Sequence, residues 1–344
     1  MNLKDLVKNA LYFGGYYRLR YSVKTSSEKR LLILMYHDLV KNDSVIGNSG
    51  FGKLTDSEFE NHLTAIKDAC RVVSVEEGIA EIKHGGGLKE NSVALTFDDG
   101  FANVYEIAFP LLKKYGVSAT VYLPTDWING KMTLWWDELY DMIMEILGDS
   151  RFDADLARIG NEMNLDPAGY QLSDGNSRFK FYQDLSHEFM KIGDDRRNEY
   201  LASLRSSISV DYKYSASEAR PMTWNQIKEM ADAGTMFGAH TCSHINLSHA
   251  DMNSAKDEIS RSKTEIETRL GRKITGFAYP YGYDVAGYAR FIPLLEEIGF
   301  DYACTSWWGN NSDDSSLYQL LRNNLPPLKS KALLKRELYI DLSE

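Results

Sequence analysis

Cysteine, long apolar runs and basic clusters are all scarce in this 344-residue chain, and each scarcity excludes a class of protein. Three cysteines without Cys-x-x-Cys spacing indicate neither a disulfide framework nor a thiolate metal site. No stretch approaches the ~18 to 20 consecutive apolar residues that span a bilayer. The 39 basic residues are outnumbered by 49 acidic ones, and no basic run carries interleaved aromatic residues, so nucleic acid is not an expected partner.

The beginning of the chain also lacks the continuous apolar core and small-residue cleavage site of a secretory signal, which predicts a cytoplasmic protein. Residues 1–30 instead carry seven Lys or Arg against two acids, with apolar residues at helical spacing. A basic amphipathic segment of this kind lies against an anionic membrane surface or, more often, packs on its own domain. The first alternative would bring the protein to a membrane surface.

Strand-like apolar runs alternate with helical patterns in the rest of the chain, which indicates a parallel α/β architecture. These runs lie near residues 31–36, 93–97, 118–123, 235–239, 274–278 and 300–305. Capping boxes at Thr55 and Thr223 predict the starts of two helices. We expect residues 31–124 and 223–344 to form one barrel domain.

The alternation breaks between residues 125 and 222, where helical patterns predominate. We interpret residues 125–222 as a helical insertion. Because it follows a barrel strand, the insertion would emerge beside an active site and could form a lid or a substrate wall. A role as a scaffold or oligomer contact is the equally open alternative.

Two pairs of polar residues follow apolar runs. Asp98 and Asp99 come directly after residues 93–97, and His240 and His244 come after residues 235–239. One carboxylate and two imidazoles can hold a metal ion with open positions for water and substrate, which leaves the second carboxylate free as a base. Each pair alone is also typical of a strand-ending turn or of a structural histidine pair. Together they indicate metal-assisted hydrolysis.

These residues resemble motifs of a known family. Leu95-Thr-Phe-Asp-Asp-Gly100 and His240-Thr-Cys-Ser-His244 are similar to the first two motifs of the polysaccharide deacetylases, the NodB-like carbohydrate esterases of family 4. Ala278-Tyr-Pro-Tyr-Gly282 is similar to the third motif, with Ala278 where the family has arginine. The resemblance spans about residues 31–124 and 223–322 and implies a distorted (β/α) barrel of about seven strands.

The resemblance also implies roles for individual residues. Asp99, His240 and His244 would hold a divalent metal, with zinc expected first and cobalt, nickel or iron as alternatives. Asp98 would be the general base, and the backbone N–H of Tyr281 would stabilise the oxyanion. We expect Arg322 to take the place of the missing arginine, which orients the base in the family.

The family's late histidine, which acts as the general acid, is missing, because no histidine follows His249. His37 follows the apolar run 31–36, and its placement resembles the circularly permuted poly-N-acetylglucosamine deacetylases, in which an early histidine replaces the late one. His37 is therefore the expected general acid. The alternative is a histidine that merely ends a buried strand.

The expected reaction is removal of N-acetyl groups from sugars or polysaccharides, with an N-acetylated glycan as partner. Trp307 and Trp308 follow a strand-like run and are expected on the substrate side together with Arg322, because sugar rings stack on aromatic side chains. A small amide or a lipid-linked or nucleotide-linked sugar is the alternative substrate. A non-catalytic glycan-binding relative is the third possibility, which the replacement at Ala278 leaves open.

Overall fold

The computed structural model describes residues 8, 11, 16, 29–41, 53–84, 87–146, 148–208, 219–328 and 330–342. Within them, parallel strands pair in a continuous series around a barrel-like sheet. In spatial order these strands are β10 (Arg322–Asn323), β1 (Leu31–Tyr36), β5 (Ser92–Phe97), β6 (Thr120–Leu123), β7 (Met236–Ala239), β8 (Gly276–Ala278) and β9 (Tyr302–Cys304). The strand β4 (Arg71–Val72) pairs with β5 outside this series.

The two ends of the series approach each other and nearly close the barrel. Cys304 in β9 forms a parallel bridge with Leu320, which lies two residues before the start of β10. The Thr305 N–H donates to the Leu320 carbonyl at 2.8 Å. The nearly closed sheet with its surrounding helices confirms the predicted (β/α) barrel of about seven strands.

Strands β1 and β5 set the position of the site. They pair in parallel over six residues, from Leu31 opposite Ser92 to Tyr36 opposite Phe97. All residues of both strands are buried, as expected for a parallel strand covered on both faces. Because their carboxyl ends coincide, the residues that follow each strand emerge at the same rim of the barrel.

Helices cover the outside of the sheet. The predicted capping boxes are present, with Thr55 and Thr223 as N-cap residues. The covering helices are α3 (Asp56–Ala69), α4 (Val75–His84), α5 (Phe109–Tyr115), α11 (Trp224–Asp232), α12 (Met252–Leu270), α14 (Ile292–Ile298) and α15 (Lys331–Asp341). Shorter elements lie in the connections: β2 (Leu39–Val40), β3 (Leu54–Thr55), a π-helix (Val104–Ala108), α6 (Thr125–Ile128), α13 (Val285–Tyr288) and a 3-10 turn (Ala289–Phe291).

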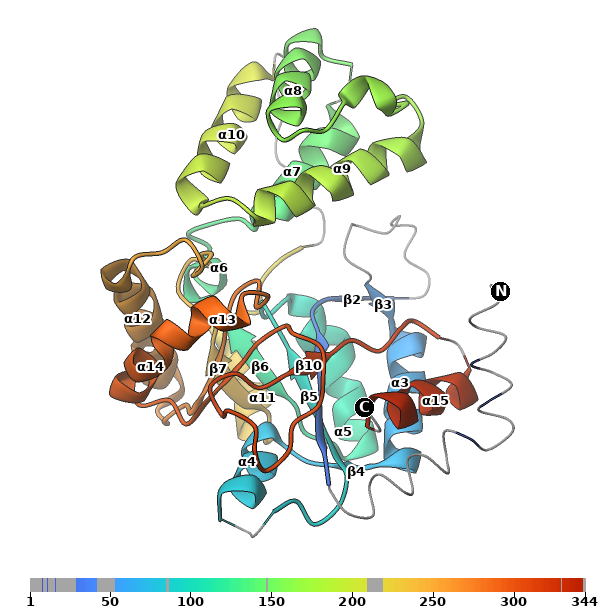
Figure 1. Ribbon diagram of the computed structural model, residues 1–344, viewed down its shortest axis with the longest axis vertical. Coiled ribbons are helices and arrows are strands. Elements are labelled where there is room, and N and C mark those ends of the chain that lie inside the picture. Colours follow the sequence, from blue (N-terminus) through green and yellow to red (C-terminus); the bar gives the residue numbers. More distant parts are fainter. Residues whose placement is uncertain are drawn as a thin grey trace.

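Four longer helices follow α6: α7 (Trp135–Glu145), α8 (Ser150–Glu162), α9 (Gly175–Met190) and α10 (Asp194–Ser207), with a 3-10 turn (Pro167–Gly169) before α9. Figure 1 shows them, mostly in green, as a layer beyond one end of the barrel. They have a hydrophobic core of their own, built around side chains such as Leu139, Phe152 and Phe181. We refer to α7–α10 as the helical insertion; its assignment as a separate domain stays a prediction.

The predicted amphipathic segment at residues 1–30 lies almost entirely outside the described residues. No helix in the described part of the chain is long and apolar enough to cross a membrane.

Candidate active site

The two consecutive aspartates at the end of β5 point to different partners. Asp98 and Asp99 are each only 2% exposed. Asp98 faces the Arg322 guanidinium, whereas Asp99 faces His240 and His244. The turn makes this divergence possible because Asp99 has a left-handed backbone conformation with φ of 69°. The geometry therefore gives the two carboxylates different partners.

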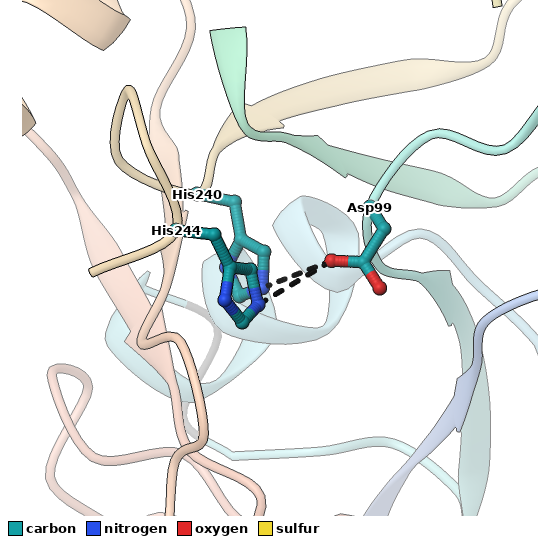
Figure 2. A group of neighbouring side chains, drawn as sticks. All are labelled: Asp99, His240 and His244. Atoms are coloured by element: carbon teal, nitrogen blue, oxygen red, sulfur yellow. Dashed lines mark ion pairs between the residues drawn. The ribbon is translucent and has the colours of Figure 1, made fainter. Parts of the chain in front are cut away.

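Asp99, His240 and His244 form a compact group of ligand atoms, all within 4.8 Å of one another. The Asp99 Oδ1 lies 3.7 Å from His240 Nε2 and 3.4 Å from His244 Nε2. Figure 2 shows both imidazole rings, which emerge from one loop, directed at the same carboxylate oxygen. This convergence is the arrangement expected of a mononuclear metal centre with two imidazoles and one carboxylate.

The donor atoms fit a divalent cation. The buried Asp99 Oδ1 has no hydrogen-bond partner among the described residues. Burial lowers the pKa of His240 to about 4 and that of His244 well below its ordinary value, so both imidazoles are neutral near pH 7, as metal ligands must be. Burial, together with the neighbouring Asp98, raises the pKa of Asp99, and a bound cation would offset this unfavourable burial of negative charge.

The loop that carries both histidines is held in an unusual conformation. Four of the five non-glycine residues with positive φ in the described chain lie in the site turns, namely Asp99, Thr241, His244 and Tyr281. Such conformations cost on the order of 1 to 3 kcal/mol each and persist where surrounding contacts hold them. Glu258 of α12 supplies such contacts, since its carboxylate accepts the N–H groups of Cys242 and Ser243 at 2.8 Å.

His240 has a partner that fixes its tautomer. Its Nδ1 lies 2.7 Å from the carbonyl oxygen of Ala278, so Nδ1 carries the proton and Nε2 is left free to bind a metal. Residue 278 thus contributes its backbone to the site even though it lacks the arginine side chain of the family motif.

Arg322 binds Asp98 in a bidentate manner. Its Nη1 and Nη2 lie 2.8 Å and 2.7 Å from the two carboxylate oxygens, and its Nε donates to the Thr305 carbonyl. Although burial alone would raise the pKa of Asp98, the adjacent guanidinium holds it well below the usual range. Asp98 is therefore ionised at any pH near neutrality. Because the Arg322 side chain is fully buried, the geometry favours positioning of Asp98 over contact with a substrate.

His37 emerges at the same rim. Its Nε2 lies 4.0 Å from Asp98 Oδ2, and its side chain is 45% exposed, in contrast to the buried imidazoles of His240 and His244. Desolvation by the surrounding groups lowers the pKa of His37, and the negative charge of Asp98 partly offsets this effect. His37 can thus contact both Asp98 and a molecule in the open part of the site.

Tyr281 of the third motif lies beside the metal-ligand group. It has a φ of 64°, and its hydroxyl accepts a hydrogen bond from Trp135 Nε1 at 2.8 Å. Its ring contacts the His244 ring edge-on, with centroids 5.0 Å apart. The third motif therefore reaches the metal-ligand group through Tyr281.

A cavity of about 550 Å³ opens above these residues. His37, Asp98, Asp99, His240, His244 and Tyr281 all line it. Its aromatic walls include Trp136 and Tyr182 of the insertion and the exposed side chains of Tyr283 and Trp308. Trp307, also exposed, is not among the described residues that line the cavity.

The sequence of the chain is similar to known proteins over most of its length. The sequence pattern of the family described as polysaccharide deacetylase matches residues 85–147 and 202–303. YxkH of Bacillus subtilis (strain 168), named as a polysaccharide deacetylase, is 30% identical over 307 residues, which cover 89% of this chain and 75% of that protein. This chain belongs to the polysaccharide deacetylase family.

Two further proteins are similar to this polysaccharide deacetylase over different fractions of its length. The poly-beta-1,6-N-acetyl-D-glucosamine N-deacetylase of Staphylococcus epidermidis is 35% identical over 108 residues, which cover 28% of this chain and 37% of that protein. The solved structure of the Streptococcus pyogenes deacetylase PplD in complex with acetate superimposes with a TM-score of 0.58 at 18% identity, covering 92% of this chain and 99% of the other. The structural likeness supports the barrel fold.

Family membership makes the chain a hydrolase, and the deacetylases of this family depend on a metal. The cavity of this deacetylase is also lined by residues that were not predicted from the sequence as site residues. Trp135, Trp136 and Asp137 of α7 line the cavity, and burial raises the pKa of Asp137 to about 7. No sequence signal distinguishes them from an ordinary amphipathic helix start.

Proposed function

We propose that this polysaccharide deacetylase removes acetyl groups from N-acetylglucosamine residues of a glycan, with zinc held by Asp99, His240 and His244. The observation that carries the proposal is the convergence of three ligand atoms, an ionised Asp98 and His37 on one cavity. The similarity to the Staphylococcus epidermidis enzyme named for poly-beta-1,6-N-acetyl-D-glucosamine supports this sugar. Cobalt, nickel and iron suit the same ligands, so zinc is the first choice among several metals.

A cation at this site would supply Lewis-acid chemistry, which activates water and polarises an acetamide carbonyl. The chain's own residues supply the proton transfers. Asp98 accepts a proton from the attacking water, and Arg322 keeps that carboxylate ionised and aimed at the cavity.

The remaining residues act on the acetamide. The Tyr281 backbone N–H is the expected donor to the oxygen of the tetrahedral intermediate. His37, on the open side of the cavity, donates a proton to the nitrogen as the C–N bond breaks. The products are acetate and a free amine, so each turnover on a glycan adds a cationic residue.

The cavity walls favour a sugar ring over a small linear amide. Trp308 is 56% exposed and lines the cavity, so its ring is available to stack on the apolar face of a sugar. Trp307 is 54% exposed and extends the same segment, where it would contact a longer chain. The intact Asp98–Arg322 pair argues against a purely glycan-binding relative.

Acetate release by the purified, zinc-loaded protein tests this proposal. The substrates would be oligosaccharides of β-1,6-linked and β-1,4-linked N-acetylglucosamine, a nucleotide-linked N-acetylated sugar and a small acetamide. We expect acetate release from an N-acetylglucosamine oligosaccharide and loss of that release in Asp98→Asn. Release from the small amide alone, or from no substrate, would contradict the proposal.

A further inference from the structure

We propose that the helical insertion holds part of the metal site in position, with Asp194 and Arg197 of α10 as positioning residues for His244 and Tyr281. This inference rests on the proposed function, because it concerns how the proposed ligand His244 is held. It assigns the insertion a role other than that of a lid or scaffold.

The two histidines are held by different means. His240 donates its Nδ1–H to the Ala278 carbonyl, as metal-bound imidazoles usually do to a neighbouring acceptor. His244 Nδ1, in contrast, has no hydrogen-bond partner among the described residues. The orientation of the His244 ring must therefore come from packing and from the conformation of its loop.

The insertion supplies one side of that packing. The Trp136 ring of α7 meets the His244 ring edge-on, with centroids 5.0 Å apart. On another side, Tyr281 makes a contact of the same length, and Tyr281 is itself bonded to Trp135 of α7. Helix α7 thus touches the ligand directly and again through the tyrosine of the third motif.

The turn between α9 and α10 holds the loop that carries His244. Two residues after this ligand, the Asn246 N–H donates to Asp194 Oδ2 at 2.8 Å, and its side-chain amide donates to the Met190 carbonyl at 2.9 Å. His249 Nε2 lies 2.9 Å from the Lys191 carbonyl. These contacts fasten the end of the loop to the insertion, whereas Glu258 of the barrel fastens its beginning.

Arg197 connects the aromatic contacts around Tyr281 with the hydrogen bond that Asp194 makes to the loop of His244. Its side chain is 3% exposed, and its Nη2 donates to Asp194 Oδ1, the second oxygen of the carboxylate that holds Asn246. Its guanidinium carbon lies 5.0 Å from the Trp135 ring centroid and 5.6 Å from that of Tyr281. A buried charge in these surroundings is costly unless it is paired, which is consistent with a specific positioning role.

The two positioning residues fall outside the part of the chain that the family sequence pattern matches. The pattern ends at residue 147 and resumes at residue 202, so Asp194 and Arg197 lie in the skipped segment. The third-motif arginine is also replaced in this chain, by Ala278. Support for the metal site thus comes partly from a segment that the family pattern does not describe.

Matched variants on one helix test the inference. Asp194→Asn and Arg197→Gln remove the positioning pair, while Asp195→Asn and Arg196→Gln remove the same charges from exposed neighbours in the same turn. The readouts are Zn²⁺ affinity by competition with a chelator, the absorption spectrum of the Co²⁺-substituted protein, and kcat and KM for acetate release. Circular dichroism checks the fold of each variant.

We expect the two positioning variants to bind Zn²⁺ about 10- to 100-fold more weakly, with an altered Co²⁺ spectrum and a reduced kcat at similar KM. The two control variants should stay within about twofold of the parent, and Arg197→Lys should recover part of the affinity, because it retains the charge beside Asp194. Parental Zn²⁺ affinity and spectrum in Asp194→Asn would overturn the inference.

Trp136→Leu provides a second test should the α10 variants fail to fold, since Trp136 is only partly buried at the cavity wall. It removes the ring contact with His244 and should weaken Zn²⁺ binding in a folded protein. Unchanged affinity there would also overturn the inference. A parent protein that binds no Zn²⁺ would contradict the proposed function instead, so the two failures are distinguishable.

Discussion

At the residue scale, the site separates two adjacent carboxylates by their partners. Asp98 is paired with Arg322 and buried, and Asp99 is buried beside two neutral imidazoles, with no hydrogen bond from any described residue to its Oδ1. The same residue type therefore has opposite pKa shifts at consecutive positions, lowered for Asp98 and raised for Asp99. Differences of this kind are typical of functional sites.

Substitution of each aspartate by asparagine should separate their roles. Asp98→Asn should keep the metal and lose about 10² to 10⁴ in kcat, because an amide cannot accept the proton of water. Asp99→Asn should lose metal affinity. Elemental analysis and acetate release on both variants check this division, and equal metal loss in the two would refute it.

His37 should affect amides and activated esters differently. Its protonated form is needed to release an amine, and its pKa is lowered, mainly by desolvation. Activity on an amide should therefore persist below that pKa and decline as the pH rises through it. The midpoint of this decline, which is the alkaline limb of the pH–rate profile, should lie below the ordinary histidine pKa near 6.5.

His37→Ala should lower the rate on an amide by a factor of about 10² to 10⁴ and abolish the alkaline limb of its pH–rate profile. The loss on an activated acetate ester should be much smaller, because that leaving group needs no proton. A histidine that only supports the structure would impair both substrates alike, so equal losses would remove His37 from the mechanism.

The residue types at the site were predictable where they follow a strand in a short motif, as with Asp98, Asp99, His240 and His244. The pairing of Arg322 with Asp98 joins residues 224 positions apart, and only the missing arginine at Ala278 gave a reason to look for it. Glu258 was not predictable, because a carboxylate on an amphipathic helix carries no signal of its buried partners.

At the element scale, each strand-like run that the sequence predicted coincides with an observed strand, whereas two-residue strands were not predicted. The six-residue strands β1 and β5 lie where the sequence predicted them, within one residue. The two-residue strands β4 and β10 were not predicted, since a two-residue segment has no periodicity to detect. Strand β10 matters because it carries Arg322. Because the strand was not predicted, the sequence also provided no position in the barrel for this arginine.

Helix α3 contains a further buried histidine, whose titration should affect stability. His62 is fully buried; its Nε2 donates to the Pro326 carbonyl, and its Nδ1 accepts from the Tyr36 hydroxyl. Burial lowers its pKa to about 4. The unfolded chain takes up this proton below about pH 6.5 and the folded chain does not, so stability declines as the pH falls from about 6.5 toward 4.

Replacing His62 with Gln should remove that part of the pH dependence. Between about pH 7 and about pH 5, the parent should lose roughly 2 kcal/mol more unfolding free energy than His62→Gln. Urea unfolding of both metal-free proteins at the two pH values measures the difference, in which the contributions of His240 and His244 cancel. The same pH dependence in both proteins would show that His62 is not buried in its neutral form.

At the scale of the whole molecule, the barrel was predictable from the alternation of strand-like and helical patterns, and a helical segment was predictable from the break in that alternation. The contacts between the insertion and the site were not. Trp136, Asp194 and Arg197 resemble ordinary surface-helix residues, and their contacts follow from how α7 and α10 meet the loop of His244. Sequence periodicity does not indicate long-range packing contacts of this kind.

We expect deacetylation by this protein to depend on one metal ion held by Asp99, His240 and His244. The most direct measurement is metal content by elemental analysis together with acetate release, for the parent, the chelator-treated parent, the zinc-restored parent and His240→Ala. We predict about one metal per chain, loss of activity on chelation with recovery on adding zinc, and neither metal nor recovery in His240→Ala. Parental metal content and activity in His240→Ala would show that His240 does not hold the metal on which deacetylation depends.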